Sequence, residues 1–245
     1  MNTNRRRFLV SGLMASAAAA SLPLQAQEAA SKPKETPLAG PIPKDRVKRT
    51  HDLAVVAEFV SAAHRDFEKV KAMVAQAPKL VLASVDTGNI GIGDWETGLN
   101  GAAHTGHRDI ALFLLSQGAR IDAFCAAMLG YRDVVLALLK ADPRTAIIKG
   151  PHNLNLLYHA AIGGDVTIAE AIKPLLPAGV PDFNQSLSAA ARDGRLDMTK
   201  WLLANGVTNV NAPDGFRKTP LKIAVEKGYD DLASVLREKG GRETL

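Results

Sequence analysis

Three histidines are the best candidates for metal ligands in this sequence, judged by residue type and spacing. His64 and His104 occupy equivalent positions in two copies of a repeated motif, so stacking of the copies would place them in adjacent rows. His107 follows His104 by three residues and could bring a third imidazole into the same neighbourhood. No acid or thiolate at a matching spacing completes a set of zinc ligands. We therefore predict no metal site and no cofactor, and a metal-dependent enzyme is the weakest of the alternatives.

Two further patterns resemble catalytic motifs. Asp86-Thr87-Gly88 matches the triplet of aspartic proteases, but that chemistry needs two paired carboxylates, and the chain has no second Asp-Thr/Ser-Gly. Gly91-Ile92-Gly93 lacks the lysine that follows in a phosphate-binding loop. Glycines so close together favour turn conformations. The segment is therefore predicted to be a turn finger.

Cys125 is the single cysteine of the chain, which excludes an intramolecular disulfide. It stands directly before two alanines, at a position expected to pack between helices. Free cysteine is among the most buried residue types, so we interpret Cys125 as a small buried hydrophobe. None of these patterns supports catalysis, and we predict that the protein is not an enzyme.

A short motif determines the expected architecture. It consists of two small residues, two spacers and usually a glycine, and its spacing corresponds to a period near 33 residues. Self-similarity at such a period is typical of stacked supersecondary units. The six copies begin at Ala62, Ala102, Ala126, Ala160, Ala190 and Ala224.

The second copy shows what one unit contains. Thr97 can cap a first short helix through its hydroxyl, and Gly106 can take a positive φ that lets this helix stop. A second helix then carries an apolar stripe at Ile110, Phe113 and Leu114. The paired alanines between Thr97 and Gly106 are small because the two helices must approach closely.

These residues resemble the ankyrin repeats, whose first helix reads Thr-Pro-Leu-His-x-Ala-Ala-x-x-Gly-His. The sixth copy has Thr219-Pro220-Leu221-Lys222-Ile223-Ala224, followed by Gly228. The resemblance covers roughly residues 52 to 243. It implies an all-α, ankyrin-type helical solenoid of about six helix-turn-helix repeats with β-turn fingers, used for protein recognition on its concave side.

Three copies depart from the pattern. The first has Asp66 in place of its glycine and is expected to be a capping unit. The third is predicted to be too short for a full helical hairpin. The fourth contains an insertion around Pro174.

The amino terminus has the pattern of an export signal. A basic segment with the pair Arg5 and Arg6 precedes an apolar, alanine-rich stretch, which resembles a twin-arginine signal. We predict a signal peptide at 1–26, a proline-rich linker at 27–50 and the ankyrin repeat domain at 51–245. The mature protein is then expected to be periplasmic or secreted.

Net charge gives no support to nucleic-acid binding. The whole chain carries +5, but the signal and linker hold nine of the basic residues and three of the acidic ones. The repeat domain keeps 21 basic and 22 acidic residues and is close to neutral. A nucleic-acid-binding domain would be expected to carry a basic face. We expect no nucleic acid, no membrane attachment after signal cleavage, and a monomer.

The pattern as a whole favours an exported module that binds a protein partner of unknown identity. An envelope scaffold that supports a stress-response enzyme is the alternative. Aromatic residues and arginine dominate interface energetics, which guides the choice of contact residues. The candidate binding residues are Trp95, Asn100, His104, His152, Phe183, Phe216 and Arg217.

Overall fold

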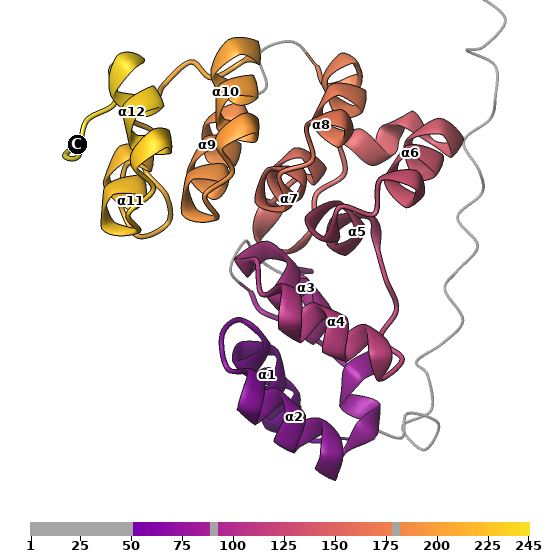
Figure 1. Ribbon diagram of the computed structural model, residues 1–245. Coiled ribbons are helices and arrows are strands. Elements are labelled where there is room, and N and C mark those ends of the chain that lie inside the picture. Colours follow the sequence, from indigo (N-terminus) through magenta and orange to yellow (C-terminus); the bar gives the residue numbers. More distant parts are fainter. Residues whose placement is uncertain (1–50, 89–92, 178–181) are drawn as a thin grey trace, which may run out of the picture. The chain divides into compact units, whose positions relative to one another are not determined.

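The computed structural model describes residues 51–88, 93–177 and 182–245, so the predicted signal and linker lie outside the described residues. Pairs of helices follow one another along the chain, as Figure 1 shows. The first helices of the pairs are α1 (Leu53–Ala63), α3 (Gly98–Thr105), α5 (Ala123–Leu129), α7 (Leu156–Gly163), α9 (Asp182–Arg192) and α11 (Pro220–Glu226). The second helices are α2 (Phe67–Gln76), α4 (Arg108–Ser116), α6 (Arg132–Ala141), α8 (Val166–Ile172), α10 (Leu196–Asn205) and α12 (Asp230–Glu238).

Short elements connect the pairs. Two strands, β1 (Ser84–Asp86) and β2 (Trp95–Thr97), form an antiparallel hairpin in which Val85 is paired with Glu96. In the described residues the remaining elements are short 3₁₀ helices: η3 (Pro78–Leu82), η4 (Pro143–Ala146), η5 (Pro151–Asn153) and η6 (Lys173–Leu175).

Polar caps explain where the first helices begin. Thr97, Asp122, Asn155 and Thr219 each precede a first helix, and each side chain accepts a hydrogen bond from the backbone N–H three residues later. Such a bond satisfies one of the amides that have no partner within the helix. Gly106 ends α3 with φ of 81°, a conformation that glycine adopts without steric cost. The predicted roles of Thr97 and Gly106 are therefore confirmed.

The paired small residues lie where the helices pack most closely. Ala102, Ala126 and Ala160 have no exposed surface. Gly163 shows how close α5 and α7 come, because a Cβ atom built there would lie 2.5 Å from the carbonyl oxygen of Ala127. Cys125 is also fully buried, as expected, and burial raises the pKa of its thiol to about 12.

Successive first helices contact one another from α1 to α11, and they form one continuous apolar core with the second helices. The described residues belong to a single compact unit. The prediction of an all-α ankyrin-type solenoid is confirmed, with the β1–β2 hairpin as the one sheet in the described residues.

The irregular repeats differ from the prediction. The third repeat is a complete pair, α5 and α6, so the expectation of an incomplete hairpin was wrong. What is short is its connection, because just six residues separate Ser116 at the end of α4 from Ala123 at the start of α5. In the first repeat, Asp66 caps α2 by accepting a hydrogen bond of 3.0 Å from the amide of Lys69. Pro174 lies in η6, directly after α8.

Repeats that are not neighbours in the chain also touch. Helix α3 contacts α7 as well as α5. Arg192 of α9 donates a hydrogen bond of 3.2 Å to the carbonyl oxygen of His104 in α3, and another of 3.4 Å to the hydroxyl of Tyr158 in α7. The segment that leads into α7 is thereby placed beside the second repeat.

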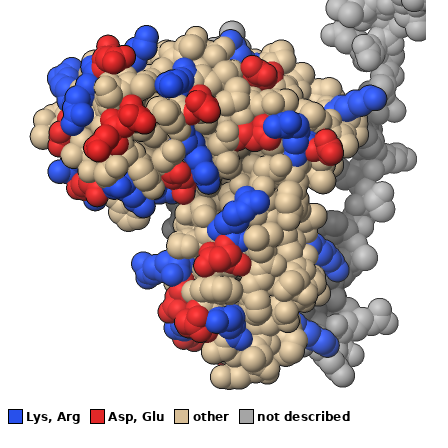
Figure 2. All heavy atoms as spheres, viewed as in Figure 1, with Lys and Arg blue, Asp and Glu red and all other residues tan. Residues whose placement is uncertain are grey.

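Charged side chains of both signs are interspersed on the face that Figure 2 shows, in agreement with the near-neutral charge of this domain. None of the helices in the described residues has the length and apolar character needed to cross a membrane.

Candidate functional site

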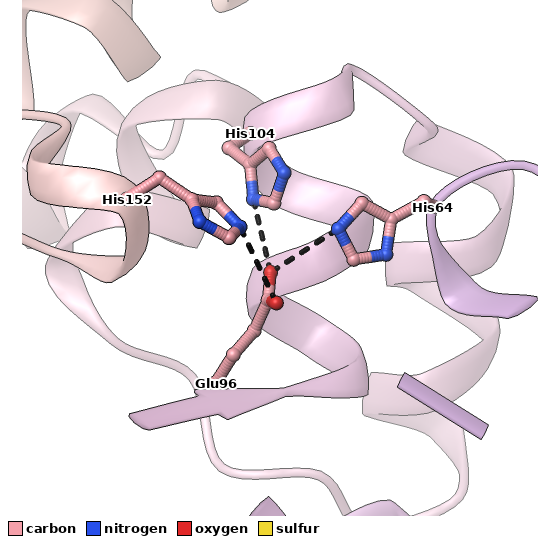
Figure 3. A group of neighbouring side chains, drawn as sticks. All are labelled: His64, Glu96, His104 and His152. Atoms are coloured by element: carbon pink, nitrogen blue, oxygen red, sulfur yellow. Dashed lines mark ion pairs between the residues drawn. The ribbon is translucent and has the colours of Figure 1, made fainter. Parts of the chain in front are cut away.

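Three histidines surround one buried glutamate. Figure 3 shows His64, His104 and His152 directed toward the carboxylate of Glu96. His64 directly follows α1 as its C-cap, and His104 lies in α3. His152 lies in η5 before α7, and Glu96 is the middle residue of β2. One ligand atom of each of these four residues, which we call the His/Glu cluster, lies within 4.8 Å of the others.

The distances within the His/Glu cluster are short. Glu96 Oε1 lies 3.4 Å from His64 Nε2 and 3.2 Å from His104 Nδ1, while Glu96 Oε2 lies 3.4 Å from His152 Nε2. The side chain of Glu96 is 1% exposed. Among the described residues, neither Glu96 Oε1 nor His104 Nδ1 has a partner with hydrogen-bond geometry. Buried polar atoms in this state are rare and call for an explanation.

Local structure accounts for the position of Glu96. Side chains alternate between the two faces of a strand. Trp95 is exposed, whereas Glu96 is buried against the first helices. His64 packs on Gly101, where a Cβ atom would lie 2.9 Å from the ring nitrogen Nδ1. A glycine at this position therefore leaves the space that the imidazole fills.

Asp94 holds His152 in place. Its carboxylate accepts a hydrogen bond of 2.8 Å from the backbone N–H of His152, and its second oxygen lies 3.3 Å from His152 Nδ1. The backbone of His152 has φ of 58°, which is unfavourable for a residue with a side chain. The Thr87 hydroxyl donates to the same carboxylate.

Protonation within the site follows from burial and charge. Burial, with the nearby charges of His64 and His152, lowers the pKa of His104 to about 2, so that its imidazole is neutral at pH 7. Burial alone would lower the pKa of His64, but the adjacent Glu96 outweighs this and raises it. Burial would likewise raise the pKa of Asp94, but the hydrogen bonds from Thr87 and His152 hold it below its ordinary value.

A cleft gives access to the His/Glu cluster. Its volume is about 420 Å³, and its lining includes His64, Glu96 and His152 together with Asp86 and Thr87 of the finger. An ion or small molecule can therefore reach the carboxylate from solvent.

The carboxylate of Asp86 makes several hydrogen bonds within the β1–β2 finger. Asp86 accepts hydrogen bonds from the amides of Gly88, Gly93 and Asp94. This is the role of a turn residue, so the protease-like triplet is structural, as predicted. Residues 89–92, which include part of the glycine-rich segment, lie outside the described residues.

Comparison with known families agrees with this architecture. Residues 157–244 match the family model for ankyrin repeats (3 copies). The carboxyl-terminal part of this chain is therefore similar to ankyrin repeats. The match includes the last three of the six copies, and no curated protein is similar enough in sequence to be counted as a relative. Ankyrin repeats generally mediate protein–protein interaction and are typically not enzymes.

The predicted contact residues fall into three groups: exposed residues, buried residues and members of the His/Glu cluster. Trp95 and Phe216 are 61% and 84% exposed, and Arg217 beside Phe216 is also exposed. Asn100 and Phe183 are buried. Asn100 forms the capping box of α3 with Thr97 and donates to Asp122, while Phe183 stacks on Trp201. Asn100 thus links the second and third repeats, whereas Phe183 packs within the fifth.

His104 and His152, also predicted as contact residues, belong to the His/Glu cluster. The third histidine of that cluster is His64, whereas His107 precedes α4 and lies outside it. Glu96, the acid that lies among these histidines, and the place of His152 beside it were not predicted from the sequence. A signal for Glu96 was its place directly before Thr97, the predicted cap of the first helix that carries His104.

Trp95 and Phe216 are exposed aromatic residues that lie between helix pairs. Trp95 lines a cleft of about 330 Å³ together with Phe124 and the segment 149–151 that leads to α7. Phe216 lies in the loop before α11, where the Asp214 carboxylate accepts hydrogen bonds from the amides of Phe216 and Lys218. This loop is held in one conformation by Asp214, which leaves Phe216 on the surface.

Proposed function

We propose that this protein is an exported protein-binding module that contacts its partner through the finger surface, which we define as Trp95, Phe216 and Arg217 with their loops. The observation that carries the proposal is the exposure of two large aromatic side chains on fingers that are otherwise held by hydrogen bonds. Such rings contribute much of the binding energy at protein interfaces when a partner covers them. Preorganised loops reduce the entropy lost on binding.

The finger surface is tested by affinity capture from the cell envelope of the producing organism. The wild type is compared with the double variant Trp95→Ala/Phe216→Ala and with Leu112→Ala, a matched control that removes an exposed apolar side chain from the second helix α4. We expect a protein retained by the wild type and the control to bind the double variant at least about tenfold more weakly. Equal binding by all three proteins would contradict the proposal.

Export through the twin-arginine route is part of the same proposal and rests on the pair Arg5 and Arg6 before the apolar stretch. Changing both to lysine keeps the charge but removes the receptor-read pair, so the precursor should accumulate in the cytoplasm. Arg7→Lys is the control, since it makes the same change one position later. Cell fractionation followed by immunoblotting measures the result. Normal export of the Arg5→Lys/Arg6→Lys variant would point to a general secretory signal instead.

A further inference from the structure

We propose that His64, Glu96, His104 and His152 bind one Zn²⁺ ion. Imidazole nitrogens and carboxylate oxygens are ligands that zinc uses, and four of them complete the tetrahedral set of a structural site. The inference concerns the His/Glu cluster alone and is independent of the finger surface.

The spacing of the donor atoms suits this ion. Bonds of about 2.0–2.1 Å directed to the corners of a tetrahedron place the ligand atoms about 3.3–3.4 Å apart. Glu96 Oε1 lies at this spacing from His64 Nε2 (3.4 Å) and His104 Nδ1 (3.2 Å), and His152 Nε2 lies 3.4 Å from the other carboxylate oxygen, Oε2. All the donor atoms lie within 4.8 Å of one another, so a small inward movement of the rings completes the site.

The tautomer of His64 directs a lone pair into the His/Glu cluster. His64 Nδ1 lies 2.8 Å from the carbonyl oxygen of Val60, and a carbonyl can accept but not donate. Nδ1 therefore carries the hydrogen, and Nε2 of the neutral ring presents its lone pair toward Glu96. Between this lone pair and the carboxylate there is a place for one positive charge, which either a proton on Nε2 or a metal ion can supply.

The surrounding groups have the arrangement that supports metal ligands. Zinc-bound histidines usually donate their second ring N–H to a carbonyl or a carboxylate, which fixes the ring and raises its basicity. Val60 supplies the carbonyl for His64, and Asp94 supplies the carboxylate for His152. The same aspartate also accepts a hydrogen bond from the backbone N–H of His152. This bond stabilises a positive φ that a residue with a side chain otherwise disfavours, and it fixes the position of the ring.

A bound cation also resolves the unsatisfied atoms. Glu96 Oε1 and His104 Nδ1 are buried without hydrogen-bond partners and lie 3.2 Å apart. Both would become ligands of the same ion. Because the ligands come from the first repeat, the second repeat and the segment before α7, the ion would also link three parts of the array.

The test uses the full chain carrying a tag without histidines, freed of metal by a chelator. Zn²⁺ is titrated by calorimetry, and the same titration is made with Mg²⁺, which prefers oxygen ligands. We expect one Zn²⁺ per chain, no measurable Mg²⁺ binding, and a Zn²⁺-dependent rise in Tm. The visible spectrum of the Co²⁺-loaded protein should be that of a tetrahedral site.

Variants locate the ion. His152→Ala and Glu96→Gln should weaken Zn²⁺ binding about 100-fold or more, whereas His107→Ala, the same change at a histidine outside the His/Glu cluster, should bind as the wild type does. Circular dichroism checks that each variant is folded. Wild-type protein that is folded but takes up no Zn²⁺ would overturn the proposal without reference to any variant. Equal affinity of His152→Ala and wild type would overturn it too.

Discussion

Removal of residues 213–245 should leave a protein that aggregates or unfolds with lost cooperativity at a lower temperature. The deleted segment contains α11 and α12, which pack on α9 and α10. In a solenoid each repeat covers the apolar face of its neighbour, so the terminal unit is needed for solubility. Leu221, Leu232 and Leu236 are buried in this last pair, and removing them exposes the surface that they cover on the fifth repeat.

The expected effect is large because the domain has little stability to lose. A few hundred Å² of newly exposed apolar surface corresponds to several kcal/mol at about 25 cal/mol per Å², which is comparable with the stability of a whole domain. Thermal unfolding followed by circular dichroism, with light scattering to detect aggregates, measures the outcome. Deletion of residues 243–245 alone is the control, since these residues are exposed and lie beyond α12. A truncated protein that stays monomeric and melts like the full chain would mean that the array ends before the sixth copy.

Ala161→Leu should lower the free energy of unfolding by about 1–3 kcal/mol, because a well-packed site has no room for added methylene groups. Ala161 has no exposed surface and lies in α7, which is packed between α5 and α9. The separation of α5 and α7 is set by direct contact, since a Cβ atom at Gly163 would meet the backbone of Ala127. The larger side chain must therefore push the helices apart or adopt a strained rotamer.

Urea unfolding of the wild type, Ala161→Leu and Ala137→Leu separates the packing effect from helix propensity. Ala137 lies in α6 and is exposed, so the same substitution there adds methylene groups without a steric conflict. Its free energy of unfolding should stay within about 0.5 kcal/mol of the wild type. If Ala161→Leu were as stable as Ala137→Leu, the paired small residues would not be at close helix contacts.

Local features of the chain were readable because they depend on residues a few positions apart. The cap at Thr97, the stop at Gly106 and the buried alanines follow from hydrogen bonding, backbone freedom and side-chain size within one repeat. The third repeat was misjudged because the spacing of motifs does not distinguish a short helix from a short connection. In the structure the connection between α4 and α5 is the part that is reduced.

The contact residues were predicted from residue type alone, and the structure shows that some of them are exposed and others are buried. Phe183 and Phe216 have the same side chain, but one stacks on Trp201 and the other is 84% exposed. Residue type predicts how much binding energy a side chain can contribute. Which neighbours cover it is a property of the packed array.

The sequence by itself thus determined the all-α repeat architecture and the capped helix ends, because both depend on short motifs that recur along the chain. The His/Glu cluster was decided by the tertiary structure. His64 and His104 share a repeat position, which the sequence revealed, but Glu96 and His152 join them through a strand alternation and through the contact of α3 with α7. That contact depends on how distant segments of the chain pack. The same is true of the positive φ of His152, which is stabilised by a hydrogen bond to Asp94, and no pattern within a single repeat predicts either feature.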